Sequence, residues 1–238
     1  MKLAIGLPIT ETVPGECFGH HVAAIVDATK KYHDVITITP VGLSPHDYAR
    51  VTIADQALAA GCDRLMFMDD DTITPRGGIQ ALMETMDERK AVAVSGFYLR
   101  RGNPYTPVWA LEKDKNWYNL DCDGGVHEIH MTGLGCCLLD LKWLEENLPK
   151  PWFRMDQNHR CTIVTDDLVL FRGIRAQNGL ILGNADVQCP HIGRREWILR
   201  ETAPALRNAY ESLSDKGIAK VMPPEPLPLD TTDLPKKE

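Results

Sequence analysis

Residues 65–72 read Leu65-Met66-Phe67-Met68-Asp69-Asp70-Asp71-Thr72, an apolar strand that runs straight into three carboxylates. In an open parallel sheet, ligands bind beyond the carboxyl ends of the strands. Asp69 and Asp71 alternate on an extended backbone, where they could meet a hard cation such as Mg²⁺ or Mn²⁺ that bridges phosphate oxygens. A solvated acidic turn ahead of the next helix explains this stretch equally well when it is taken alone.

Short β-rich runs and helical patterns alternate on either side of this stretch. Strands are predicted over 3–7, 35–41 and 64–68, and helices over 18–31 and 47–60. This alternation predicts an α/β fold with a mostly parallel sheet flanked by helices. The predicted buried faces are Phe18, Val22, Ile25 and Thr29 in the first helix and Ala49, Ile53, Ala57 and Ala60 in the second, which Gly61 ends.

The second half of the chain is less regular. A helix is predicted to open at Pro75 and a strand to cover 91–95, after which the sequence becomes aromatic and turn-rich from about residue 102. Order returns with a strand over 131–139, a helix over 141–147 and a helix from Asp166 that buries Leu168, Phe171 and Ile174. We expect one domain over 1–221, with a C-terminal helix over 194–221, and a Pro-rich flexible tail over 222–238.

Composition excludes several classes of function. The 238 residues carry a formal net charge of -7, which disfavours general binding to nucleic acid or anionic lipid. Seven cysteines without a CxxC pair disfavour a disulfide framework and a structural zinc site. The sequence shows no signal peptide and no apolar run of about 18 residues, so a cytoplasmic protein without a membrane span is expected.

Two other enzyme classes use an acidic turn after a strand. A haloacid-dehalogenase-type phosphatase needs Thr or Val after its DxDx, but here Ile73 follows Asp69-Asp70-Asp71-Thr72. A sugar nucleotidyltransferase carries a Gly-rich loop with an arginine after its first strand, whereas this chain has Pro8-Ile9-Thr10-Glu11-Thr12 there. The first class is excluded and the second is weakened.

At this point the chain resembles the GT-A glycosyltransferases, in particular small family-2-like enzymes with a DxD motif. The resemblance covers the chain from its first strand to about Gly193, and it rests on the joint order of the motifs. The matching segments are 6–10, Ser44 with Ala49-Arg50, 67–71, 95–98, 132–139, 165–168 with Gly179, and 191–193. It implies a nucleotide-sugar-binding half over about 1–101 and an acceptor and catalytic half over about 102–193.

The resemblance also implies roles for single residues on the side of the sugar donor. Pro8 and Thr10 would line the nucleobase and ribose pocket, and Arg50 would reach a donor phosphate or support that loop. Asp69 would face the ribose, with Asp70 beside it in the donor site. The metal, Mn²⁺ or Mg²⁺, would be bound by Asp71 and His191, with Asp69 close by as a further ligand. A divalent cation offsets the charge of a diphosphate leaving group.

Asp166 and Asp167 open a helix, where carboxylates are favoured by the helix dipole, so simple capping is one explanation. An inverting transferase also needs a carboxylate that takes the proton of the acceptor hydroxyl. The family pattern favours the second acid, so Asp167 is the predicted base and Asp166 would orient the acceptor. In a retaining enzyme, both acids would bind substrate instead.

The acceptor side is less marked. Gly133 permits close approach of a sugar to the backbone, although a tight bend in a sheet would require glycine as well. Trp109 is the predicted aromatic contact of the acceptor. Arg194, Arg195 and Arg200 lie beside His191 and could hold phosphate or form a solvated helix face.

The predicted function is metal-dependent transfer of a sugar from a UDP- or GDP-sugar to an acceptor, which could be a glycan, a protein, a small molecule or a modified nucleobase. The protein could also form a homo-oligomer. A sugar nucleotidyltransferase and a non-catalytic nucleotide-sugar-binding module are the alternatives that the sequence leaves open.

Overall fold

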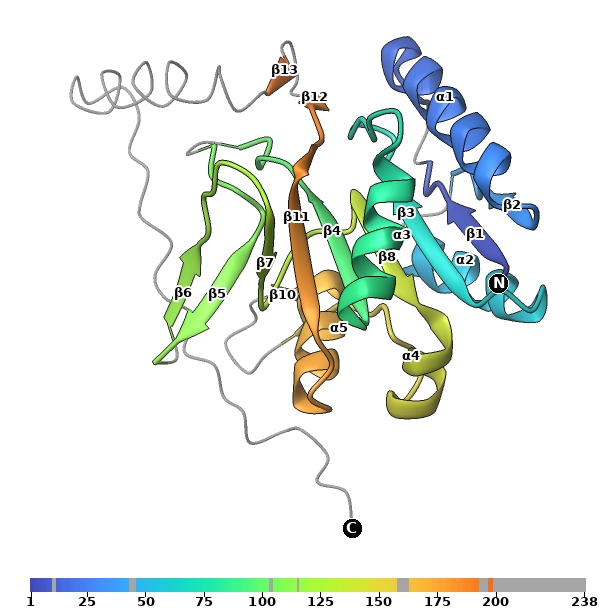
Figure 1. Ribbon diagram of the computed structural model, residues 1–238. Coiled ribbons are helices and arrows are strands. Elements are labelled where there is room, and N and C mark those ends of the chain that lie inside the picture. Colours follow the sequence, from blue (N-terminus) through green and yellow to red (C-terminus); the bar gives the residue numbers. More distant parts are fainter. Residues whose placement is uncertain are drawn as a thin grey trace.

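The computed structural model describes residues 1–9, 12–42, 46–102, 105–114, 116–157, 163–192 and 197–198. Its centre is a seven-stranded sheet in the order β2-β1-β3-β8-β4-β11-β7, shown in Figure 1. The strands are β1 (Leu3–Gly6), β2 (Val35–Ile38), β3 (Arg64–Met68), β4 (Ala93–Phe97), β7 (Val126–Glu128), β8 (Cys136–Asp140) and β11 (Ile181–Gln188).

The sheet is mixed and mostly parallel, as predicted. β1 runs parallel to β2 and β3, and β11 runs parallel to β4. β8 lies antiparallel between β3 and β4. β7 pairs antiparallel with β11 as an outer strand of the sheet. β8 runs in the opposite direction to its neighbours β3 and β4. The carboxyl ends of β3, β4 and β11 and the start of β8 therefore lie along the same edge of the sheet, the edge where these three strands end.

Helices cover both faces of the sheet. α1 (Gly15–Lys31) and α3 (Gly78–Arg89) share one core with β1 and β3, and Figure 1 shows α3 in front of the sheet. α2 (His46–Ala59), α4 (Leu141–Asn147) and α5 (Asp166–Ala176) pack into the core on the other face. Since α2 precedes β3 and α5 precedes β11, both helices begin at the edge where these strands end.

The predicted face of the first helix is only partly right: Ile25 packs against the core, but Thr29 is exposed. Phe18 and Val22 are 60% and 43% exposed, and the buried residues of α1 are Cys17, His21, Ala24 and Ala28. Small side chains let the helix lie close to the sheet, so the larger apolar residues point outward. In α2, the prediction is confirmed for Ala49, Ile53 and Ala57, whereas Ala60 lies beyond the end of the helix and is exposed.

The second half departs further from the prediction. The strand expected over 131–139 is the shorter β8, and the strand expected over 91–95 is β4, shifted by two residues. The helix over 141–147 is confirmed, and the helix from Asp166 buries Phe171 and Ile174 while Leu168 is only partly buried. The sequence did not predict β11, which contains Gly183, Asn184 and Asp186.

Three small two-stranded sheets complete the described structure. They pair β5 (Ala110–Lys113) with β6 (Asn116–Asn119), β9 (Asp156–Gln157) with β10 (Ile163–Val164), and β12 (His191–Ile192) with β13 (Trp197–Ile198). β13 is a strand inside the range predicted as a C-terminal helix. The rest of 194–221, including Arg194, Arg195 and Arg200, and the tail over 222–238 lie outside the described residues. Within the part that is described, no helix is long and apolar enough to cross a membrane.

Candidate active site

The acidic turn Asp69–Asp71 follows β3 at the edge where the strands end. The backbone N–H of Asp69 donates a hydrogen bond to the carbonyl of Gly135 at 3.0 Å, which joins the turn to the segment before β8. From the opposite side, the buried ring of His21 on α1 contacts the carbonyl of Thr72, with Nε2 at 3.0 Å from the oxygen. The turn is therefore held from two elements, and His21 is a supporting residue that the sequence did not reveal.

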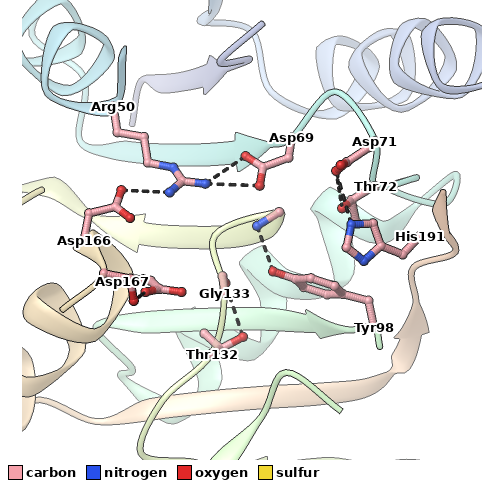
Figure 2. Close-up of polar contacts among 12 residues, drawn as sticks. Arg50, Asp69, Asp71, Thr72, Tyr98, Thr132, Gly133, Asp166, Asp167 and His191 are labelled. Atoms are coloured by element: carbon pink, nitrogen blue, oxygen red, sulfur yellow. Dashed lines mark hydrogen bonds and ion pairs between the residues drawn. The ribbon is translucent and has the colours of Figure 1, made fainter. Parts of the chain in front are cut away.

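Asp71 and His191 are brought together by the backbone. The N–H of Ile73 donates to the carbonyl of Pro190, and the N–H of Ile192 donates to the carbonyl of Asp71, both at 2.8 Å. Thr72 and His191 form an antiparallel bridge. As a result, His191 Nε2 lies 3.3 Å from Asp71 Oδ1 although the two residues are 120 positions apart, and Figure 2 shows the two side chains facing one another.

This pair fits a divalent cation. His191 Nδ1 donates to the carbonyl oxygen of Leu99 at 2.7 Å, so Nε2, which faces Asp71, is the ring nitrogen that a metal could take. Burial opposes ionisation of Asp71, but its contacts with His191 and Arg101 outweigh that effect and lower its pKa. An ionised carboxylate suits Mn²⁺ or Mg²⁺, and an imidazole nitrogen is a common ligand of divalent transition metals, to which Mn²⁺ belongs.

Asp69 does not belong to this pair. Both of its carboxylate oxygens accept hydrogen bonds from Arg50 Nη2 at 3.1 Å. Among the described residues, no group of three His, Cys, Asp or Glu side chains is placed to hold a metal. Asp69 thus faces Arg50 in this structure, and its part as a further metal ligand stays a prediction; a metal bound by Asp71 and His191 would take other ligands from phosphate oxygens and water.

Arg50 connects the acidic turn to the start of α5, as Figure 2 shows. Its Nη1 donates to Asp166 Oδ2 at 2.7 Å while Nη2 holds Asp69. The side chain of Arg50 is only 9% exposed. Burial alone would lower its pKa, but attraction by Asp69 and Asp166 raises it. Of the two predicted roles of Arg50, these contacts fit support of the acidic turn, and the contact with a donor phosphate stays a prediction.

Asp166 and Asp167 differ in their surroundings although they are neighbours at the first turn of α5. Asp166 is buried against Arg50. Asp167 accepts hydrogen bonds from the hydroxyl of Thr165 and, at 2.7 Å, from the N–H of Leu168. Burial and the nearby charge of Asp166 raise the pKa of Asp167. A raised pKa makes Asp167 a better proton acceptor than an ordinary aspartate, whereas the Asp166 carboxylate is bound by Arg50.

Tyr98 lies between His191 and the glycine segment before β8. Its hydroxyl accepts a hydrogen bond from the N–H of Gly135 at 2.9 Å, and its ring meets His191 edge to face, with the ring centroids 5.6 Å apart. A Cβ atom at Gly133 would overlap the same hydroxyl. Contact with Tyr98 therefore accounts for glycine at Gly133. The sequence contained Tyr98 in a matching segment but gave no sign of this role.

The remaining predicted site residues fall into three groups. Trp109 is fully buried and its indole N–H donates to the carbonyl of Gly96, so it belongs to the core and the prediction that it contacts the acceptor is corrected. Gly133 and Asp70 are partly exposed at the site edge, and Pro8 is buried directly after β1. Thr10 lies outside the described residues.

Comparison with known proteins gives structural likeness only. No protein family model and no curated protein matches the sequence. The chain is similar to A197 from STIV, with a TM-score of 0.57 and 17% identity over 84% of this chain and 94% of that one. It is also similar to residues 1–349 of S. aureus TarS, solved with UDP-GlcNAc, with a TM-score of 0.51 and 11% identity over 82% of this chain and 59% of that one.

A third similar structure is GalNAc-T7, solved with UDP, GalNAc and Mn²⁺. Its TM-score is 0.51 and its identity 11%, over 82% of this chain and 44% of that one. The chain thus spans less than two thirds of the TarS and GalNAc-T7 structures and nearly all of A197. These likenesses establish the architecture of the whole sheet: the chain has the GT-A fold.

Proposed function

We propose that this protein is a metal-dependent glycosyltransferase that moves a sugar from a nucleoside diphosphate sugar to the hydroxyl of an acceptor. The observation that carries the proposal is the meeting of Asp71 with His191, at 3.3 Å, on the same edge of the sheet as the acid pair Asp166 and Asp167. One set of groups suits a cation and a diphosphate, and the other suits removal of a proton. A transferase needs both at one edge.

The donor would bind at the carboxyl ends of β1 and β3. Pro8 and Thr10 would line the nucleobase and ribose, and Asp69 and Asp70 would face the ribose. Asp71 and His191 would hold Mn²⁺ or Mg²⁺, which supplies positive charge to the diphosphate. The structures of TarS with UDP-GlcNAc and of GalNAc-T7 with UDP and Mn²⁺ favour a UDP-sugar over a GDP-sugar as the first donor to test.

Asp167 would act as the general base of an inverting reaction. The acceptor oxygen gives its proton to the Asp167 carboxylate and forms a bond to the anomeric carbon. The bond between that carbon and the phosphate oxygen breaks, and its electron pair leaves with the nucleoside diphosphate. Asp166 would not share this duty, because Arg50 holds it at 2.7 Å. Its part is to orient the acceptor and the helix that carries the base.

The test is release of nucleoside diphosphate from UDP- and GDP-sugars in the presence of Mn²⁺ and a panel of acceptors. We expect the native protein to release UDP or GDP, and the Asp71→Asn and His191→Ala variants to lose this activity. His33→Ala is the matched control, because His33 is exposed between α1 and β2, at the opposite edge of the sheet. An Asp71→Asn, His191→Ala double variant with full activity would exclude the proposed metal site.

Two further measurements separate the alternatives: pyrophosphate release and binding of the nucleotide sugar. A sugar nucleotidyltransferase would release pyrophosphate from a nucleoside triphosphate and a sugar phosphate. A binding module would bind the nucleotide sugar without any turnover.

A further inference from the structure

Arg101 lies beside Asp71 and His191, on the segment that follows β4. Its Nη1 is 2.6 Å from Asp71 Oδ2, while the other oxygen of the same carboxylate faces His191. Leu99, two residues earlier, accepts the hydrogen bond from His191 Nδ1. The segment from Leu99 to Arg101 therefore contacts both Asp71 and His191. The Asp71 carboxylate contacts the imidazole of His191 and the guanidinium of Arg101 at the same time.

Asp71 and Arg101 differ in their freedom to move. Asp71 is fixed by the hydrogen bond from Ile192 N–H to its carbonyl, and its side chain is 18% exposed. The side chain of Arg101 is 62% exposed and ends a long, flexible stem. A divalent cation on Asp71 would repel a guanidinium bound to the same carboxylate. Arg101 is the partner that would leave, because Asp71 is held in place.

An arginine released at this place would meet the leaving group. A guanidinium binds phosphate oxygens with two parallel hydrogen bonds and keeps its charge at every working pH. The negative charge of the proposed diphosphate would attract the guanidinium. Repulsion by the metal and attraction by the diphosphate would therefore both move Arg101 away from Asp71.

We propose that Arg101 competes with the metal for Asp71 and, once displaced by it, binds the diphosphate of the sugar donor; this inference rests on the proposed function. Arg101 thereby makes metal binding weaker in the absence of nucleotide and nucleotide binding stronger in the presence of metal. Loss of the side chain must change the two affinities in opposite directions, an outcome that a merely structural role would not give.

The first experiment measures Mn²⁺ binding without nucleotide, by electron paramagnetic resonance of free Mn²⁺. Arg101→Gln should bind Mn²⁺ roughly threefold more tightly than the native protein, the size expected for loss of a partly exposed ion pair. Arg100→Gln is the matched control, since Arg100 is exposed and adjacent and the substitution removes the same charge. Arg101→Lys should resemble the native protein. Equal Mn²⁺ affinities of Arg101→Gln and Arg100→Gln would overturn the inference.

The second experiment measures binding of UDP and GDP at saturating Mn²⁺ by calorimetry. Arg101→Gln should bind the preferred nucleotide roughly tenfold more weakly than Arg100→Gln, the fold-change of one lost charge-assisted hydrogen bond. Equal affinities of the two variants would overturn the inference while the proposed function stands. Native protein that binds neither UDP nor GDP with Mn²⁺ would overturn the proposed function itself.

Discussion

Arg50 lies between Asp69 and Asp166, two acids that come from distant parts of the chain. The three side chains are largely withdrawn from water, with exposed fractions of 9%, 23% and 7%. Removing one member of a buried ion pair leaves the other charge without compensation and costs far more than the pair itself contributes. The structural role of Arg50 is thus to hold the acidic turn and the first turn of α5 in a fixed relation.

Arg50→Gln should lower the free energy of unfolding by about 3 kcal/mol, because Asp69 and Asp166 lose their cation. Arg50→Lys keeps the charge but cannot reach both carboxylates with a planar fork, so its loss should be smaller. Urea denaturation at neutral pH measures both. An Arg50→Gln variant as stable as the native protein would show that the two acids do not depend on Arg50.

Asp167→Asn should be inactive yet more stable than the native protein at neutral pH. Burial and the charge of Asp166 raise the folded pKa of Asp167 above its unfolded pKa. The stability that this shift contributes is complete below the unfolded pKa and is lost as the pH rises through the folded pKa. Asparagine removes the buried charge, while kcat should fall about 10²- to 10⁴-fold with the loss of the base.

Asp166→Asn is the comparison variant, and it should be less stable than the native protein because Arg50 loses a partner. The kcat of the native enzyme should fall at acidic pH with a midpoint above that of an ordinary aspartate. Thermal unfolding at pH 7 and a kcat profile against pH check these outcomes. Asp167→Asn with native kcat, or with lowered stability, would contradict the assignment of the base.

At the scale of elements, the segment before β8 depends on the end of β4. Gly133→Ala should destabilise the protein by about 2 kcal/mol, because the added methyl overlaps the hydroxyl of Tyr98 and the core is closely packed. Tyr98→Phe removes that hydroxyl, so the same glycine substitution should cost less in a Tyr98→Phe background. Gly19→Ala, at an open position on α1, is the control and should be neutral or stabilising. If denaturation shows that Gly133→Ala lowers the free energy of unfolding equally in both backgrounds, this explanation is wrong.

The elements also show what the sequence could predict. Alternating strand and helix patterns predicted the first three strands and α2, because these follow local periodicity. The buried face of α1 was predicted only in part, because a pattern of large apolar residues cannot show that small side chains pack on the sheet. β11 was missed because Gly183, Asn184 and Asp186 break the pattern, although Asn184 is buried and donates to Thr85 at 2.9 Å.

The sequence predicted which residues lie at the candidate site more successfully than it predicted which of them contact one another. Asp71 and His191 were expected together and do lie together, but only the tertiary structure reveals that Asp69 turns to Arg50. Trp109 was assigned to the acceptor because tryptophan often stacks on sugars, whereas its position over Gly183 makes it a core residue. Tyr98 was overlooked because its role depends on two segments that meet only in the fold.

At the scale of the whole molecule, the sheet gathers distant parts of a 238-residue chain at one edge. Asp71 follows β3, His191 follows β11, and Asp166 and Asp167 begin α5. The antiparallel β8 starts where β3 and β4 end, so the glycine segment before β8 also reaches this edge. We expect metal and nucleotide to stabilise the protein together, since both would bind groups that only the folded chain assembles.

We propose that Asp71 and His191 form a metal site for a nucleotide, and thermal unfolding with UDP and GDP, each with Mn²⁺ and with a chelator, tests this proposal. Free ligand at about 100 times its Kd should stabilise the native protein by about 2.7 kcal/mol. We expect a rise in Tm with one nucleotide that the chelator abolishes and that Asp71→Asn lacks, while His33→Ala retains it. A nucleotide-dependent rise that persists with the chelator or in Asp71→Asn, or no rise with either nucleotide, would contradict the claim.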